Sequence, residues 1–215
     1  MNSGLPAENN ERVKSYSKEF TFLYRKYLKM QAGAKLAEWQ MFFFIMFGKR
    51  FDFSHIHIPQ TCEGFDGLFV KPFGLSAREI FSVMKSHIGN VDALHENDLD
   101  DLSSPRSAVD TYAGWWQLCI TADEKHANKS LCDCEKEGVP ILNCEERLLL
   151  GLWHHWKFGV HLDGSSNRTK LSITLTSSRT RSGLALCVMG SNRVLVIGCD
   201  PNDRNRSLRP REIIV

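Results

Sequence analysis

The clearest pattern of hydrophobic and polar positions runs from Lys170 to Pro201, where three apolar segments are separated by short polar ones. Aliphatic and hydroxyl side chains alternate over 171–176, which predicts a strand with one buried face and one solvated face. The segments Leu184–Met189 and Val194–Ile197 are almost entirely apolar. Because Gly190-Ser191-Asn192 between them tolerates positive φ, a hairpin is the expected connection. The pattern predicts an antiparallel β-meander.

Two stretches before this meander have helical periodicity. From Asn9 or Asn10 to about Gln31, apolar residues recur at spacings of three and four beside basic residues, which predicts an amphipathic helix with a solvated face. A second helix is expected between Gly33 and Gly48, where almost no polar face remains. A helix that is apolar all round is either buried or in contact with a partner.

Capping sequences mark two further helices. Ser76 and Glu79 have the spacing of a capping box, and the apolar stripe that follows them ends at a glycine. Asn143 and Glu146 form a second pair, which opens a helix that extends to about Phe158. The leucines and tryptophans of this last helix recur at helical spacing, so we expect them to face the sheet.

Shorter segments predict additional strands. Arg50–Ile58 alternates in character and places His55 and His57 on one face. The segments 68–70 and 112–121 are apolar enough to form strands of the core.

These elements predict an α+β fold, in which helices cover a C-terminal antiparallel meander and the N-terminal region is helical. An acidic loop near 97–107 is the expected place for any joint. It would separate a helical part with a short strand pair, 1–96, from an α+β part with the antiparallel sheet, 108–215. We expect the two parts to form one continuous domain, because 215 residues that are 42% hydrophobic suffice for one substantial core.

The apolar segments are too short for a membrane protein. The longest uninterrupted run, Met41–Phe47, has seven residues, whereas a spanning helix needs roughly 20. The N-terminus lacks the apolar centre of a secretory signal. We therefore expect a cytoplasmic protein with no membrane partner, and an odd number of cysteines, 7, fits reduced thiols there.

Cysteines and histidines in the middle of the chain are the best candidates for metal ligands. They are Cys132, Cys134, Cys144, His126, His154 and His155. Zinc sites usually take ligands in pairs spaced by two to four residues. The cysteine pair here is C-x-C and the fourth ligand has no fixed position, so we expect neither a metal nor a cofactor.

Charge is distributed unevenly along the chain. Between Val91 and Glu146 there are 13 acidic and 4 basic residues, a balance of −9. From Gly164 onward there are 9 basic and 3 acidic residues, a balance of +6. The simplest interpretation is that these two regions are neighbours in the fold.

The loop expected over Ser177–Gly183 is the most distinctive polar feature. It combines hydroxyl groups with Arg179 and Arg181, and it holds no acidic residue. Converging donors of this kind suit a phosphate or carboxylate, so Ser177, Ser178, Arg179 and Arg181 are candidate ligand-binding residues. The alternative is a solvated turn whose hydroxyls bond to their own backbone.

No nucleophile elbow, phosphate loop or zinc-protease motif is present in the sequence. The favoured interpretation is a cytoplasmic, non-catalytic interaction or ligand-binding protein, whose partner is an unknown protein or an anionic small molecule. Its contact surfaces would be the Ser177–Gly183 loop and the pair Trp115 and Trp116. Adjacent tryptophans of a strand point to opposite faces, so one indole is expected to be exposed or at an interface.

Two other functions stay open. In an enzyme acting on an anionic substrate, Arg179 and Arg181 would clamp the substrate, and a histidine would be the acid or base. The candidate histidines are His154, His155 and His161. A nucleic-acid-associated protein is the second alternative, although a pI near 8.2 is below the value typical of dedicated binding domains. A pocket joining a histidine to the arginines would favour the enzyme, and a flat basic face the binder.

Overall fold

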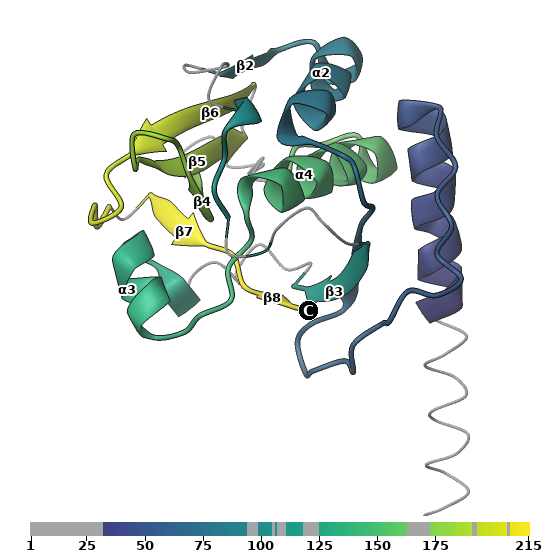
Figure 1. Cartoon of the computed structure of the whole chain (residues 1–215), viewed down its shortest axis with the longest axis horizontal. Coiled ribbons are helices and arrows are strands. Elements are labelled where there is room, and N and C mark those ends of the chain that lie inside the picture. Colours follow the sequence, from purple (N-terminus) through teal and green to yellow (C-terminus); the bar gives the residue numbers. More distant parts are fainter. Residues whose placement is uncertain are drawn as a thin grey trace, which may run out of the picture. The chain divides into compact units, whose positions relative to one another are not determined.

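The computed structural model (Figure 1) describes residues 32–93, 99–104, 106, 111–117, 125–162, 173–190, 193–205 and 207–215. The chain forms two compact units, Met1–Glu38 and Trp39–Val215. In the first unit the described residues, 32–38, are helical, and the helix continues to residue 47 within the second unit. The helix expected from Asn9 or Asn10 to Gln31 lies outside the described residues. None of the helices searched is long and apolar enough to cross a membrane.

The predicted meander is confirmed as the centre of a five-stranded sheet. Strands β4 (Ile173–Arg179), β5 (Ala185–Gly190) and β6 (Val194–Cys199) pair in antiparallel fashion. Two short parallel strands extend this sheet, β2 (Val91–Ala93) beside β6 and β7 (Leu208–Pro210) beside β4. The strand order is β2-β6-β5-β4-β7. The apolar run of β5 fits its burial, because successive side chains of a strand point to opposite faces and Ala185–Val188 are all buried.

A second, three-stranded sheet has the order β1-β3-β8. Its strands β1 (Gly67–Lys71), β3 (Tyr112–Trp116) and β8 (Ile213–Ile214) are antiparallel. A Cβ at Gly114 would lie 2.8 Å from the carbonyl oxygen of Ile214. Glycine at this position therefore permits the C-terminal strand to approach β3 closely. The fold is α+β, as the sequence predicts.

Helix α4 (Cys144–Phe158) connects the cores of the two sheets. It contacts β4 and β5 of the larger sheet and β1 of the smaller one (Figure 1). Every residue from Cys144 to Trp153 is buried except Glu145, which is half-buried. Helix α2 (Ala77–Ile88) packs against α4. Such continuous burial is expected of a helix that is covered on several sides.

Both predicted helix starts are confirmed, but the capping box predicted for Ser76 and Glu79 is only half formed, because the carboxylate of Glu79 pairs with Lys49. The hydroxyl of Ser76 accepts a hydrogen bond from the backbone N–H of Glu79 at 3.2 Å. Asn143 and Glu146 bond reciprocally in a complete capping box. Helix α3 (Leu131–Lys136) also begins with a capping box, but it was not expected from the sequence. It is too short to have a distinct apolar periodicity.

An aromatic cluster holds the helix over 32–47 through its buried face. The indole of Trp39 stacks on that of Trp153, with ring centroids 5.3 Å apart and an interplanar angle of 13°. Its N–H donates to the carbonyl of Leu68 at 2.8 Å. Phe42 and Phe43 are fully buried beside it. The part of this helix from Trp39 onward therefore belongs to the core along one face.

The strand predicted over Arg50–Ile58 is wrong, because these residues form a turn and extended coil. The backbone N–H of Ser54 donates to the carboxylate of Asp52 at 2.9 Å. The N–H of Ile56 donates to the carbonyl of Phe53 at 3.2 Å. These local bonds satisfy backbone groups that a strand would offer to a neighbouring strand.

The joint predicted near 97–107 is only partly described. Ser103 forms an antiparallel bridge with Arg179, and Arg106 pairs with Glu146. The described part of this stretch is thus bonded to β4 and α4. The division into 1–96 and 108–215 stays a prediction.

Candidate functional site

The residues predicted to bind an anion lie mainly within β4. The strand extends through Arg179, so the connecting turn covers only 180–184. Ser177 and Ser178 are buried, and the hydroxyl of Ser178 accepts a hydrogen bond from the backbone N–H of Cys144 at 2.9 Å. The expectation that these hydroxyls belong to an exposed loop is therefore wrong. They satisfy backbone groups of the core instead.

Arg179 has an acidic partner that the sequence did not indicate. Its Nη2 lies 3.0 Å and 2.9 Å from the two carboxylate oxygens of Glu135 on α3. Burial alone would lower the pKa of Arg179, but the hydrogen bonds to Glu135 and Cys132, together with the charges of these two groups, raise the pKa overall. Arg181 is exposed in the turn. Anion binding by this turn stays a prediction, and Arg181 is the cation best placed for it.

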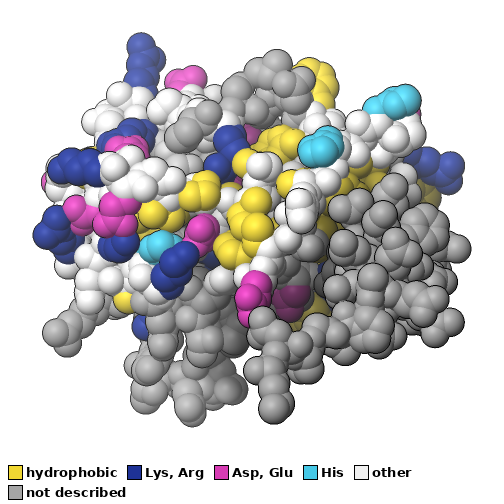
Figure 2. Space-filling view, turned by 90° about the horizontal axis from the view of Figure 1, so that it is seen from below, with side chains coloured by type: hydrophobic (Ala, Val, Ile, Leu, Met, Phe, Trp, Pro, Cys, Tyr) yellow, Lys and Arg dark blue, Asp and Glu magenta, His cyan; other side chains and the backbone are white. Residues whose placement is uncertain are grey.

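The acidic and basic regions of the sequence are neighbours in the fold, as the simplest interpretation held. Arg204 donates to both carboxylate oxygens of Asp133, at 2.8 Å and 2.7 Å. The hydrogen bonds from Arg204 are the largest cause of the lowered pKa of Asp133. Figure 2 shows Lys and Arg intermixed with Asp and Glu at the left of the view. This surface carries charges of both signs, so it is not a uniformly basic face.

Both tryptophans proposed for partner binding are buried, with 4% of Trp115 and none of Trp116 exposed. The indole N–H of Trp115 donates to the carbonyl of Pro59 at 2.8 Å. Trp116 lies edge-on to Trp153, with centroids 6.1 Å apart. The expectation that one indole reaches the surface is wrong, because both faces of this sheet are covered.

The candidate histidines gather where α4 ends. Nδ1 of His154 lies 2.9 Å from the carbonyl of Val160, and the rings of His155 and His161 are 5.3 Å apart. The guanidinium of Arg179 bonds to α3 instead. The histidine contacts lie at the C-terminal end of α4, and the enzyme alternative stays a prediction.

Two of the three candidate metal-ligand cysteines behave as core side chains. Cys134 and Cys144 are fully buried. Burial raises the pKa of Cys134 to about 11 and that of Cys144 to about 12. Within the described part of the chain, no three potential ligand residues lie together as a metal would require.

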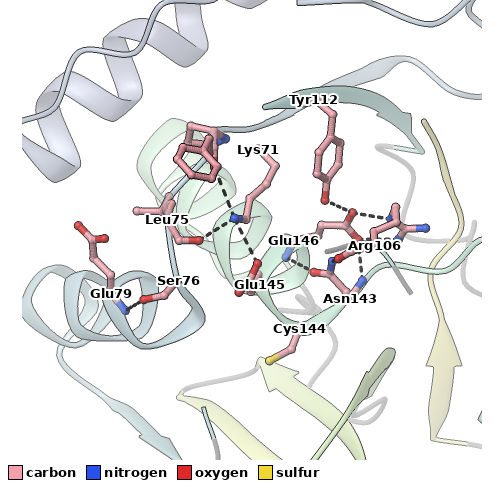
Figure 3. Close-up of polar contacts among 12 residues, drawn as sticks. Lys71, Leu75, Ser76, Glu79, Arg106, Tyr112, Asn143, Cys144, Glu145 and Glu146 are labelled. Atoms are coloured by element: carbon pink, nitrogen blue, oxygen red, sulfur yellow. Dashed lines mark hydrogen bonds and ion pairs between the residues drawn. The ribbon is translucent and has the colours of Figure 1, made fainter. Parts of the chain in front are cut away.

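The most densely bonded polar group is the carboxylate of Glu146, which is fully buried at the start of α4 (Figure 3). It accepts hydrogen bonds from Nε and Nη2 of Arg106 at 2.8 Å and 2.7 Å. The hydroxyl of Tyr112 donates at 2.5 Å, and the backbone N–H of Asn143 at 2.6 Å. Burial, followed by the charge of Glu146, raises the pKa of Tyr112 far above its usual value.

A second charged pair lies beside this group (Figure 3). The ammonium of Lys71 has no exposed surface and lies 3.2 Å from a carboxylate oxygen of Glu145. It also donates to the carbonyl oxygens of Leu75 and Pro72, at 2.6 Å and 3.5 Å. No pattern in the sequence singles out Lys71, which follows an apolar strand segment.

Neither buried group has capacity left for a substrate. A carboxylate offers about four acceptor sites and an ammonium three donors. Glu146 receives four hydrogen bonds, and Lys71 has three oxygen partners. The two groups therefore stabilise the junction of α4 with β1 and β3, and we assign them a structural role.

The exposed face of the helix over 32–47 is the best candidate interaction site. Its large apolar side chains Met41, Phe44 and Ile45 are 51%, 50% and 52% exposed. They occupy positions i, i+3 and i+4, which lie on the same side of a helix. The guanidinium of Arg50 lies 5.0 Å from the ring centroid of Phe44. A hollow of about 330 Å³ is lined by Gln40, Met41, Phe44, Arg50 and Phe51.

No protein-family model, no curated protein and no solved structure matches this chain. Among the described residues, the face formed by Met41, Phe44 and Ile45 combines large exposed apolar side chains with a hollow and a basic edge.

Proposed function

We propose that the protein is a non-catalytic interaction protein, which binds an acidic amphipathic helix of a partner protein along Met41, Phe44 and Ile45. The cytoplasmic location expected from the sequence is part of this proposal. The observation that carries it is the half exposure of three large apolar side chains on one helix. Contiguous exposed apolar side chains of this kind commonly mark interaction surfaces.

A helix is the favoured occupant because of the spacing of the contact residues. Side chains at i, i+3 and i+4 form ridges, and the groove beside them accepts the ridge of a second helix. The hollow between Met41, Phe44 and Phe51 would accept one apolar side chain of the partner. The opposite face of the helix is fixed by Trp39 and Phe42 in the core, so binding need not order it.

The basic edge of the face favours an acidic partner. Arg50 is exposed and lies over the ring of Phe44, where its guanidinium can donate to a carboxylate at the rim. A second copy of the chain would present the same basic residue to this edge, which disfavours self-association. Charge at the rim selects the partner more than it adds affinity.

The expected affinity is modest. Fully burying an exposed large apolar side chain is worth roughly 1.5–3 kcal/mol, so a half-exposed one contributes about half of that. Three such side chains supply on the order of 3 kcal/mol, which must offset part of the entropy lost on association. Micromolar binding corresponds to about −8 kcal/mol, so we expect binding no tighter than this, with the apolar side chains of the partner, the hollow and the rim charge supplying the larger share.

Synthetic peptides test the proposal. An amphipathic helical peptide with leucine on one face and glutamate on the other is labelled, and its binding is followed by fluorescence anisotropy. Matched peptides carry lysine in place of glutamate, or the same residues in scrambled order. We expect the wild-type protein to bind the acidic helix and to bind the other two much more weakly.

Two variants locate the binding. The double substitution Phe44→Asp with Ile45→Asp should abolish binding of the acidic peptide. Phe73→Asp is the matched control, because Phe73 is 60% exposed on a separate turn. The proposal fails if no peptide binds, if the lysine peptide binds equally, or if the double variant still binds. Sedimentation of a dimer that the double variant disrupts would assign the face to self-association instead.

A further inference from the structure

Two cysteines of adjacent strands lie in unusually close contact. Cys187 is on β5 and Cys199 ends β6, and their sulfur atoms are 2.6 Å apart. A disulfide bond is about 2.05 Å long, so the two sulfurs are roughly 0.5 Å from bonding distance. No other pair of cysteine sulfurs is bonded or hydrogen-bonded among the described residues.

The strand register explains why the two thiols meet. Cys187 pairs with Ile197, and Ala185 pairs with Cys199. The cysteines are thus offset by two residues across the ladder, which puts both side chains on the same face of the sheet. Diagonal neighbours are usually farther apart than direct partners, but the twist of an antiparallel pair shortens one of the two diagonals.

We infer that Cys187 and Cys199 form a reversible dithiol–disulfide pair, which is closed by exchange with a small-molecule disulfide such as oxidised glutathione. The site goes beyond the proposed interaction function and does not depend on it. Both residues are free thiols in the structure, which represents the reduced form. Oxidation would join β5 to β6 across their hairpin.

The surroundings of the pair give the two thiols different roles. Cys187 is fully buried in the core cluster that includes Leu131 and Leu175, whereas Cys199 is partly exposed at the edge of this cluster. An external disulfide can therefore reach Cys199 first. The hydrogen bond with Cys187 lowers the pKa of Cys199, although burial and the nearby Asp203 oppose the effect. A lower pKa makes more of the attacking thiolate available.

The exchange proceeds in two balanced steps. The thiolate of Cys199 attacks one sulfur of glutathione disulfide, forms a mixed disulfide and releases one glutathione thiolate. Cys187 then loses its proton to solvent and attacks the sulfur of Cys199, which releases the second glutathione thiolate. Two protein thiols and one small-molecule disulfide thus become one protein disulfide and two small-molecule thiols, with two electrons transferred.

The inference is tested on the wild-type full-length protein. Reduced protein is equilibrated with reduced and oxidised glutathione at several ratios, quenched with acid, alkylated and digested with trypsin. Cleavage after Arg193 places the two cysteines in separate peptides. We expect a linked peptide pair that contains Cys187 and Cys199, a loss of two alkylated thiols, and full reversal by dithiothreitol.

Variants distinguish a Cys187–Cys199 disulfide from disulfides that involve other cysteines. Cys199→Ser should abolish the linked peptide, and Cys62→Ser should leave it unchanged, because Cys62 is exposed elsewhere in the chain. Cys187→Ala should trap the mixed disulfide with glutathione on Cys199. The inference is overturned if the wild type retains all its thiols, accumulates only the mixed disulfide, or links a different pair. These wild-type outcomes decide the question even if a core variant fails to fold.

Discussion

The guanidinium of Arg106 donates to both carboxylate oxygens of Glu146, from Nε at 2.8 Å and from Nη2 at 2.7 Å. Nη2 of Arg106 also donates to the carbonyl of Ile141. One arginine thus bonds both to the capping residue of α4 and to the backbone that leads into it. Burial alone would lower the pKa of Arg106, but Glu146 raises it.

Removing this arginine should destabilise the protein strongly. In Arg106→Met the carboxylate of Glu146 stays buried without its counter-charge, which typically costs about 3–5 kcal/mol. Denaturant unfolding followed by tryptophan fluorescence measures the loss. Lys49→Met is the matched control, because the pair Lys49 and Glu79 is exposed, and such pairs contribute at most about 1 kcal/mol. Equal losses in the two variants would contradict the structural role of Glu146.

Truncating Trp153 should also be costly. Its ring stacks on Trp39, and only 4% of the residue is exposed. Trp153→Ala should lower the free energy of unfolding by about 3–5 kcal/mol, because it removes a large buried ring. Phe73→Ala, at an exposed position, should change it by less than about 1 kcal/mol. A loss below about 1 kcal/mol for Trp153→Ala would mean that the aromatic core is not packed as described.

The pair of Asp133 and Arg204 should contribute a pH-dependent part of the stability. Arg204 holds the pKa of Asp133 below its usual value of about 3.9 in the folded protein. The contribution is therefore present above about pH 4 and is lost as the pH falls toward the lowered pKa.

Urea unfolding of the wild type and of Arg204→Gln at several pH values measures this contribution. The difference between the two proteins should be largest near neutral pH and should shrink below about pH 4. Arg181→Gln removes an exposed arginine from the turn after β4 and controls for net charge. A difference that is constant across the pH range would show that Arg204 does not interact with Asp133.

The reactivity of the thiols should follow their burial. Cys62 is exposed and should react rapidly with Ellman's reagent in the reduced native protein. Cys134 and Cys144 should react only on unfolding, because burial raises the pKa of the first to about 11 and of the second to about 12. Reduced, denatured protein should give a total near 7 thiols. If Cys62→Ser left the rapid phase intact, another thiol would have to be accessible.

Local features of the sequence determined a large part of this fold. The alternation over 171–176 and the turn residues at 190–192 predicted the β-meander, and side chain–backbone capping predicted the starts of α2 and α4. These signals succeed because they depend on the period of a strand or on hydrogen bonds between residues a few positions apart. The same reasoning failed for Arg50–Ile58, where an Asp52–Ser54 turn replaced the expected strand.

Only the tertiary structure decided the surroundings of the charged and aromatic side chains. Arg179 bonds to Glu135, which is 44 positions away in the sequence. Lys71 of β1 pairs with Glu145 of α4. Packing on both faces of β3 buries Trp116. Phe44 is half-exposed, although it belongs to a run of residues that is uniformly apolar in the sequence. Contacts of this kind depend on how sheets and helices stack, and residue spacing within one segment carries no information about which segment will cover it.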